Sequence, residues 1–175
     1  MTPNLPTLIT ISRIVLIPFF IFLTPYNPIL GATIFAIASA TDFVDGYIAR
    51  KRGQITRFGI ILDPIADKFL VISALILLVD MARLSAWIAI VIIVREFLVT
   101  ALRVAALSKD IVIPAEAGGK WKTGFQIAAI LCLIVDLSIG PIDLYDVGIV
   151  FIWIALILAI VSGIQYTVAF WKRLL

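Results

Sequence analysis

The sequence predicts an all-α integral membrane protein, a bundle of six transmembrane helices that forms one domain over residues 1–175. Three observations predict this fold class. Hydrophobic residues make up 63% of the chain, whereas a soluble domain is usually about half apolar. The mean hydropathy is +1.18. The apolar residues also fall into long runs, and a chain of 175 residues has room for about six helical spans of roughly 20 residues.

Segments rich in proline, glycine or charge separate the apolar runs and set the bounds of the spans. These breaks fall at residues 25–28, 51–53, 80–83, 108–119 and 140–146. The predicted spans are therefore about 5–24, 29–50, 57–80, 85–107, 118–138 and 147–170. Arg13 and the apolar run after it could also form a signal peptide. Cleavage there would still leave an almost wholly membrane-embedded chain, so we interpret this run as the first span.

The positive charges predict the orientation of the spans. Basic residues gather in the second and fourth loops and at the C-terminus: Arg50, Lys51, Arg52, Arg57, Lys109, Lys120, Lys122, Lys172 and Arg173. The loops of the opposite side contain Arg83 as their one basic residue, and the fifth loop carries Asp136, Asp143 and Asp146. Six spans with the N- and C-termini in the cytoplasm fit every loop. We therefore expect a multi-pass protein of the cell membrane.

The composition excludes several kinds of site and partner. The chain has no histidine, which excludes imidazole as a base, a nucleophile or a metal ligand. Its single cysteine, Cys132, cannot form an internal disulfide, and CxxC metal spacing is absent. The net charge is only +3, and the basic residues flank apolar runs as membrane orientation requires. We expect the lipid bilayer to be a partner and nucleic acid not to be one.

Ionisable residues inside the predicted spans indicate function, because charge in a membrane is costly and rare. They are Arg13, Asp42, Asp45, Asp63, Asp67, Lys68, Arg95, Glu96 and Arg103. Each aspartate would cost roughly 2.5–3.5 kcal/mol at the centre of a lipid-facing helix. The aspartates are therefore expected to face a hydrated or ion-filled cavity.

The spacing of the four aspartates predicts that they meet between two helices. Asp42 and Asp45 lie about 60° apart around the second helix, and Asp63 and Asp67 lie about 40° apart around the third. A short loop makes these helices antiparallel neighbours, so both pairs lie at similar depth near the cytoplasmic end. Four carboxylates cannot all ionise at close range without cations between them. Oxygen ligands without nitrogen or sulfur predict Mg²⁺, Mn²⁺ or Ca²⁺.

Structural explanations of the same residues stay open. Any one aspartate could form a structural ion pair with Arg50 or Lys68, although this does not explain four aspartates on two facing stripes. Gly46, Ala49 and Gly59 could be helix-packing residues, as small residues are in many membrane bundles. They could equally make room for a nucleotide, and the two roles can coexist.

Residues 42–67 carry a recognisable pattern: Asp42-x2-Asp45-Gly46-x2-Ala49-Arg50-x8-Gly59-x3-Asp63-x3-Asp67. This pattern resembles the signature of the CDP-alcohol phosphotransferase family at all eight fixed positions. The resemblance implies that an alcohol displaces CMP from a CDP-linked lipid with the help of two Mg²⁺ or Mn²⁺ ions. It implies that Asp42, Asp45 and Asp63 bind metal, and that Asp67 is the catalytic base and can also bind metal. It further assigns CDP-lipid binding to Asp45, Gly46, Ala49, Arg50 and Gly59.

Other segments resemble the bacterial phosphatidylglycerophosphate synthases, a branch of this family. They are residues 4–7, 12–18, 95–103 and 119–123. This resemblance implies transfer of the phosphatidyl group from CDP-diacylglycerol to sn-glycerol 3-phosphate. The family resemblance implies a homodimer, and the predicted orientation places the active site toward the cytoplasm. Four cations would then bind the acceptor phosphate: Arg95, Arg103, Lys120 and Lys122. For both lysines the alternative is ordinary positive-inside anchoring, and Arg95 could instead pair with a carboxylate of the core.

Other functions compete with this hypothesis. The same chemistry could use serine, inositol, inositol phosphate or phosphatidylglycerol as acceptor. A cation transporter would also place aspartates in membrane helices, but the glycine and alanine among them, together with Arg50, favour a nucleotide site. A purely structural membrane subunit would leave the aspartates unexplained.

Overall fold

The computed structural model describes the backbone of residues 5–52, 57–107 and 117–174, and six helices make up most of it. These are α1 (Leu5–Leu23), α2 (Pro28–Arg52), α3 (Arg57–Asp80), α4 (Ala86–Leu107), α5 (Ala117–Val135) and α6 (Leu144–Leu174). The predicted all-α class is confirmed. Some side chains lie outside the described part, including all those of residues 42–52 and 57–67.

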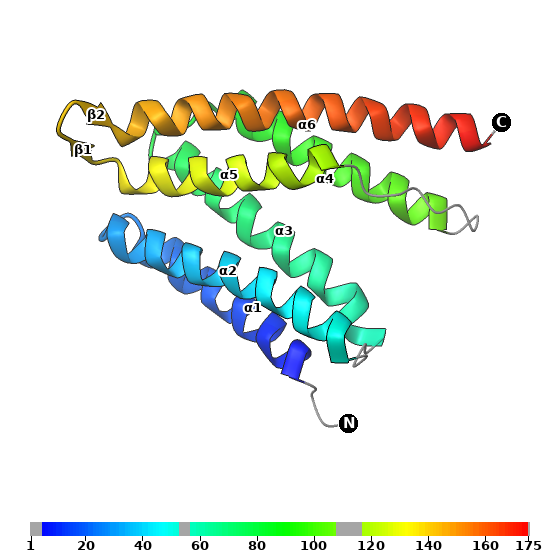
Figure 1. The fold of residues 1–175 in the computed structure, drawn as a ribbon. Helices are drawn as coiled ribbons and strands as arrows, with labels where there is room; N and C mark the ends of the chain where they lie inside the picture. Colours follow the sequence, from blue (N-terminus) through cyan, green and yellow to red (C-terminus); the bar gives the residue numbers. More distant parts are fainter. Residues whose placement is uncertain (1–4, 53–56, 108–116, 175) are drawn as a thin grey trace.

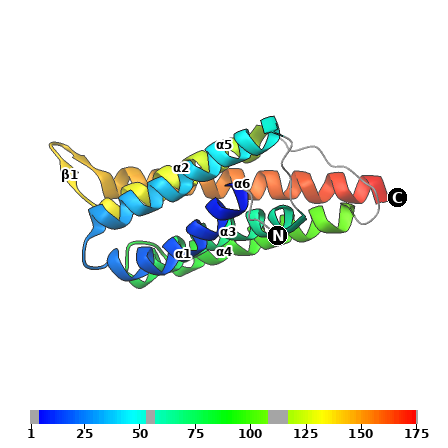
Figure 2. The same ribbon diagram turned by 90° about the horizontal axis from the view of Figure 1, so that it is seen from below.

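Successive helices run in opposite directions along the molecule (Figure 1). The first residues of α1 and the last residues of α6 therefore lie at the same end. The pair α1 and α2 diverges from the pair α5 and α6 toward that end, as Figure 1 shows. Helix α3 contacts α1, α2, α4 and α5, and Figure 2 shows α3 beside α4 in the view from below. The aspartate-bearing halves of α2 and α3 lie at the end where the two pairs diverge.

The turn between α1 and α2 shows how the sequence determines the direction of the chain. Asn27 caps α2, because its side-chain oxygen accepts a hydrogen bond from the Leu30 amide at 3.1 Å. Pro28 follows at the first helical position, where its missing N–H is not required. The fully buried Thr24 hydroxyl donates to the Phe20 carbonyl at 2.5 Å. Gly31 leaves room for Thr24, since a Cβ there would lie 2.2 Å from its Oγ1.

The connection between α5 and α6 differs from the predicted loop. Helix α5 ends at Val135, before the predicted residue 138, and α6 begins at Leu144, before the predicted residue 147. A short antiparallel hairpin joins them, with β1 (Ser138–Ile139) paired to β2 (Ile142–Asp143). Asp136 and Gly140 have φ angles of 45° and 63°, in the left-handed region that ends helices and closes tight turns. This backbone reversal stops α5 early.

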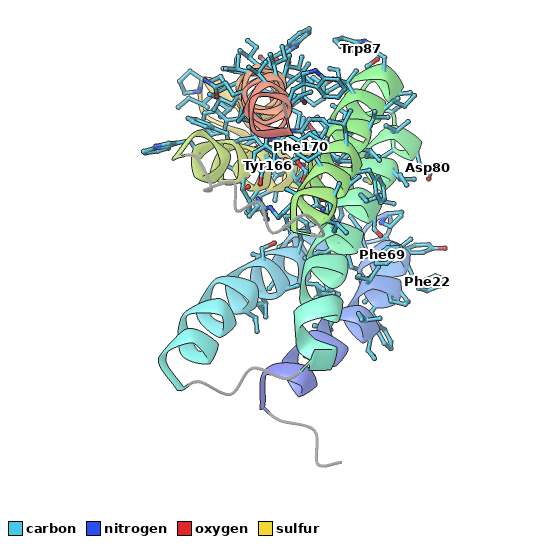
Figure 3. The ribbon with its side chains drawn as sticks, turned by 90° about the vertical axis from the view of Figure 1, so that its right-hand side faces the viewer. Phe22, Phe69, Asp80, Trp87, Tyr166 and Phe170 are labelled. Carbon is cyan, nitrogen blue, oxygen red and sulfur yellow. The ribbon has the colours of Figure 1, made fainter. Side chains whose placement is uncertain are left out.

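The core lies where the helices converge, away from the end at which they diverge. The rings of Phe20 and Phe35 pack against each other in a tilted arrangement, with their centroids 5.7 Å apart. The largest fully buried apolar side chains come from all six helices: Phe20, Phe35, Leu70, Leu75, Leu78, Ile92, Ile130, Leu133, Ile134 and Ile152. Other large apolar side chains point away from the helices, as Figure 3 shows for Phe22, Phe69 and Trp87. Exposed apolar surface on this scale is typical of a protein that meets lipid or a partner.

One helical segment of the described residues, Leu144–Trp171 in α6, is both long enough and apolar enough to cross a membrane. It has 28 residues, more than the roughly 20 that a span requires. Shorter apolar helical stretches cover Ile14–Leu23, Pro28–Thr41 and Trp121–Val135. The apolar segment of α6 agrees with a membrane protein. Six membrane passes and cytoplasmic termini stay predictions.

Candidate active site

The aspartate motif lies on two helices that contact each other. Asp42 and Asp45 belong to the C-terminal half of α2, as do Gly46, Ala49 and Arg50. Gly59, Asp63 and Asp67 belong to the N-terminal half of α3. The predicted placement on two consecutive helices is therefore confirmed at the level of the backbone. The side chains of all eight residues lie outside the described part of the chain, so their roles stay predictions.

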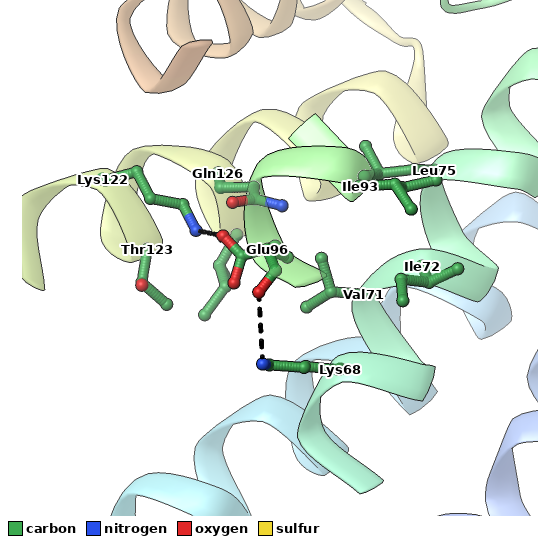
Figure 4. Close-up of a pocket in the computed structure, with 10 residues that line it drawn as sticks. Lys68, Val71, Ile72, Leu75, Ile93, Glu96, Lys122, Thr123 and Gln126 are labelled. Atoms are coloured by element: carbon green, nitrogen blue, oxygen red, sulfur yellow. Dashed lines mark hydrogen bonds and ion pairs between the residues drawn. The ribbon is translucent and has the colours of Figure 1, made fainter. Parts of the chain in front are cut away.

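A polar cavity lies between α3, α4 and α5, directly after the aspartate segment of α3 (Figure 4). Its volume is about 30 Å³, which is room for one or two water-sized groups. Apolar side chains make up half of its lining: Val71, Ile72, Leu75, Ile93 and Ile127. Polar and charged side chains make up the other half: Lys68, Glu96, Lys122, Thr123 and Gln126. Polar groups that converge on one cavity are a recurrent feature of ligand sites.

Glu96 on α4 joins the charged groups of this cavity. Its carboxylate accepts a hydrogen bond from the Lys122 ammonium of α5 and another from Arg95 Nη1 at 3.0 Å. Lys68 Nζ of α3 donates to the backbone carbonyl of Glu96 at 3.4 Å. Figure 4 shows the two lysines on either side of Glu96. Two lysines and one carboxylate line the described cavity, which therefore carries a net positive charge.

Arg95 connects α4 to α6. Its Nε donates to the Ala159 carbonyl at 2.9 Å, and its Nη2 donates to the Ser162 hydroxyl at 2.6 Å. A Cβ at Gly163 would lie 3.3 Å from Arg95 Cγ, so the glycine provides the space through which the arginine passes. With Nη1 on Glu96, all three guanidinium nitrogens are engaged within the protein. The structural ion pair considered from the sequence is therefore present.

Arg103 lies two turns beyond Arg95 on α4 and also faces α6. Its Nε donates to the Tyr166 hydroxyl at 3.4 Å, and its guanidinium carbon lies 5.8 Å from the centroid of the Tyr166 ring. The structure thus joins Arg95 and Lys122 on Glu96, and it places Arg103 against Tyr166 instead. Lys120 belongs to the first turn of α5, and its side chain lies outside the described residues.

Sequence reasoning did not identify several polar residues at this site. Thr123 and Gln126 line the cavity beside Lys122, and Ser162 binds Arg95 from 67 positions away. Gln126 lies four residues after Lys122, which puts both on one face of a helix. That spacing is the one signal that could have found it. No sequence signal pointed to Ser162. A serine within an apolar run commonly hydrogen-bonds its own helix, as Ser162 does with the Leu158 carbonyl at 2.7 Å.

The position of Asp67 links the aspartate motif to the cavity. Asp67 immediately precedes Lys68 in α3 and lies one helical turn before Val71, and both of these neighbours line the cavity. A group held in the cavity would therefore lie about one turn along α3 from the aspartate segment. Anion binding by the cavity and acid–base or metal chemistry by the aspartates could then act on one substrate.

A divalent cation fits the aspartate segment by the chemistry of its donors. Among the side chains that the structure describes, no group of three or more histidine, cysteine or acidic residues could hold a metal. The four aspartates of the motif, Asp42, Asp45, Asp63 and Asp67, lie outside that set. Four carboxylates without nitrogen or sulfur donors suit hard cations such as Mg²⁺ and Mn²⁺. Their donor chemistry fits such an ion, and their role as its ligands stays a prediction.

Comparison with known proteins identifies the family. The model of the CDP-alcohol phosphatidyltransferase family matches residues 3–161. The chain is 41% identical over 187 residues to a CDP-diacylglycerol–glycerol-3-phosphate 3-phosphatidyltransferase of Bacillus subtilis (strain 168), with 98% of this chain and 97% of that protein covered. Proteins of the same name from Rickettsia bellii and Haemophilus influenzae are 40% and 42% identical and cover 93% of this chain, with 93% and 91% of their own lengths covered. The predicted resemblance is confirmed, and the chain belongs to the CDP-alcohol phosphatidyltransferase family.

Proposed function

We propose that this chain transfers the phosphatidyl group of CDP-diacylglycerol to sn-glycerol 3-phosphate, forming phosphatidylglycerophosphate and releasing CMP. The observation that carries the proposal is the net positive cavity of Lys68, Glu96 and Lys122, which begins one residue after Asp67 on α3. An acceptor that carries its own phosphate requires cations beside the catalytic carboxylates, and this cavity provides them. The three relatives described above are named for the same donor and acceptor, which supports this proposal.

The chemistry follows from the aspartates of α2 and α3. Asp67 takes the proton of the attacking hydroxyl of the acceptor. The acceptor oxygen forms a bond to the phosphorus on the diacylglycerol side, the bond from that phosphorus to the CMP oxygen breaks, and CMP leaves with the electron pair. Asp42, Asp45 and Asp63, with Asp67 as a further ligand, would hold two Mg²⁺ or Mn²⁺ ions. Bound ions of this kind neutralise charge on the pyrophosphate and on the leaving group.

The small residues of the motif would bind the donor. Gly46 and Ala49 lie one and four residues beyond Asp45 on α2, so one helical face combines a carboxylate with little side-chain bulk. We propose that the cytidine group lies against this face. Arg50, one residue further, would offer planar donors to the pyrophosphate, and Gly59 on α3 would leave space on the opposite side.

The contacts of the cations proposed for the acceptor phosphate support different roles for them. We assign the direct contact to Lys122, because it lines the cavity. We assign Arg95 a supporting role without direct contact to the phosphate, since its three nitrogens already bind Glu96, Ala159 and Ser162. Arg103 and Lys120 lie nearer the end of the molecule that carries the termini. There they would attract the phosphate as it enters from the cytoplasm.

We further propose one membrane domain over residues 1–175, with six spans and cytoplasmic termini, that works as a homodimer in the cell membrane. The antiparallel order of the helices supports an even number of passes, because the described ends of α1 and α6 lie at the same end (Figure 1). The apolar side chains on the outside support contact with lipid. The motif then lies near the cytoplasmic end, where soluble glycerol 3-phosphate and CMP can be exchanged.

A panel of acceptors tests this proposal. Purified protein in detergent would receive labelled CDP-diacylglycerol, Mg²⁺ and one acceptor at a time: glycerol 3-phosphate, glycerol, serine, inositol, inositol phosphate or phosphatidylglycerol. Glycerol 3-phosphate should give the highest kcat/KM, and glycerol should be poor because it lacks the phosphate. Faster reaction with serine or inositol would contradict the acceptor while leaving the aspartate chemistry standing.

A further inference from the structure

Gln126 on α5 is a buried side chain with an unsatisfied donor. The residue is only 2% exposed, and its Nε2 has no hydrogen-bond partner in the described structure. A buried amide N–H without a partner is costly and rare in folded proteins. Gln126 lines the polar cavity together with Lys122 and Thr123, and Figure 4 shows its side chain there. A group that enters the cavity can therefore accept the missing hydrogen bond.

The charged groups around Gln126 do not supply that partner. Glu96 accepts from Lys122 and Arg95, and Lys68 donates to the Glu96 backbone. The other buried side-chain atom that lacks a partner, Ser39 Oγ on α2, is not among the residues that line this cavity. The unsatisfied donor is thus located beside the charges proposed to bind the acceptor.

The acceptor proposed above has a group that requires such a donor. Glycerol 3-phosphate carries a phosphate, a primary hydroxyl that reacts and a secondary hydroxyl that does not. The phosphate is assigned to Lys122 and the reacting hydroxyl to Asp67, which leaves the secondary hydroxyl without a partner. A cavity of about 30 Å³ admits a group the size of a hydroxyl. Gln126 lies one turn, about 6 Å, from Lys122 along α5, a separation that a three-carbon phosphate can bridge.

We propose that Gln126 determines acceptor specificity by donating a hydrogen bond from its amide to the secondary hydroxyl of glycerol 3-phosphate. This inference rests on the proposed function and adds a residue to it. A site with a buried polar group positioned for a substrate hydroxyl rejects the analogue that lacks this hydroxyl, because the group then stays unpaired. The matching analogue here is 3-hydroxypropyl phosphate, which keeps the phosphate and the reacting hydroxyl.

The test compares kcat/KM for these two acceptors in the parent protein, in Gln126→Met and in Gln165→Met. Methionine has nearly the volume of glutamine and no amide, and Gln165 is exposed on α6, which makes it a matched control. The parent and Gln165→Met should prefer glycerol 3-phosphate by at least about 100-fold. In Gln126→Met this preference should fall at least tenfold, with the KM for CDP-diacylglycerol within about twofold of the parent value.

The possible failures are distinguishable. If Gln126→Met keeps the parent protein's preference for glycerol 3-phosphate, the inference is overturned. If Gln126→Met does not fold, the comparison of the two acceptors in the parent protein still tests the inference. Equal kcat/KM for both acceptors in the parent protein would overturn it. A parent that releases no CMP with either acceptor would overturn the proposed function, and the inference with it.

Discussion

The carboxylate of Glu96 and the ammonium of Lys122 form an ion pair that joins α4 to α5. Both side chains are mostly buried, with exposed fractions of 19% and 6%. Removing one partner of a buried pair leaves the other charge without compensation, whereas removing both can be nearly neutral. The pair therefore contributes to folding as well as to the site.

Glu96→Gln should lower the free energy of unfolding by about 3–5 kcal/mol, because Lys122 and Arg95 lose their shared carboxylate. Chemical denaturation in detergent measures this change. The double variant Glu96→Gln with Lys122→Met should be less destabilised than the sum of the single variants, since it leaves no unpaired lysine. Strictly additive losses would show that the two side chains act independently.

Arg103→Ala and Lys120→Ala should each raise the KM for glycerol 3-phosphate by about tenfold, because each removes a cation that attracts the acceptor phosphate toward the site. The KM for CDP-diacylglycerol should change little. Tyr166→Phe removes the hydroxyl that accepts from Arg103 and keeps the guanidinium. Its effect on the KM for glycerol 3-phosphate therefore measures this contact apart from the charge of Arg103.

Arg83→Ala is the matched control for these two variants. Arg83 lies at the opposite end of the molecule, where it pairs with Asp136 at 3.1 Å and donates to the Leu133 carbonyl at 3.1 Å. Its loss should affect stability and neither KM. Equal increases of both KM values in Arg103→Ala and Lys120→Ala would show that these cations support the fold and not the acceptor.

Asp67→Asn should show whether Asp67 acts mainly as the general base or as a metal ligand. If Asp67 is mainly the base, the variant should bind metal and CDP-diacylglycerol as the parent does, while kcat falls by about 10²–10⁴-fold or more. Asp42→Asn, Asp45→Asn and Asp63→Asn should weaken metal binding itself, since an amide is a poorer ligand for a hard cation. Calorimetric metal titration distinguishes the two classes, and a similar loss of metal binding in Asp67→Asn would make it primarily a ligand.

Gly46→Leu and Ala49→Leu should block CDP-diacylglycerol binding, because a large side chain would fill the space proposed for the nucleotide. Gly124→Leu on α5 is the control, since nothing lies within 4 Å of a Cβ at that position. Lipid-binding assays on detergent-solubilised variants measure the effect. Unchanged affinity in Gly46→Leu or Ala49→Leu would assign that residue to helix packing.

Much of the fold could be predicted from the sequence because the apolar runs and their breaks determine the helix bounds. The predicted end of the third span and the observed end of α3 are both at residue 80. The hairpin between α5 and α6 was not predicted, since residues 138–143 lack a strong strand signal. Asp136 reverses the backbone there with a positive φ, a conformation that aspartate tolerates better than most residues.

The candidate site was predictable only where local spacing carries the information. The aspartates repeat at helical intervals along α2 and α3, so their helices and faces could be inferred. Glu96 was noticed as a charge in a span, but its pairing with Lys122 joins residues 26 positions apart, and the bond from Arg95 to Ser162 joins residues 67 apart. Such contacts depend on how the helices pack and not on periodicity. The role of Gln126 likewise became visible only with the cavity.

The most direct test of the central claim measures both products of the reaction in purified protein. With Mg²⁺, CDP-diacylglycerol and glycerol 3-phosphate, the protein should form CMP and phosphatidylglycerophosphate in equal amounts. Excess EDTA should stop the reaction, and renewed Mg²⁺ or Mn²⁺ should restore it. Turnover that persists in EDTA would contradict the role of metal. Absence of CMP release, combined with uptake of divalent cations into protein-containing vesicles, would contradict the proposed transferase activity and favour a cation transporter.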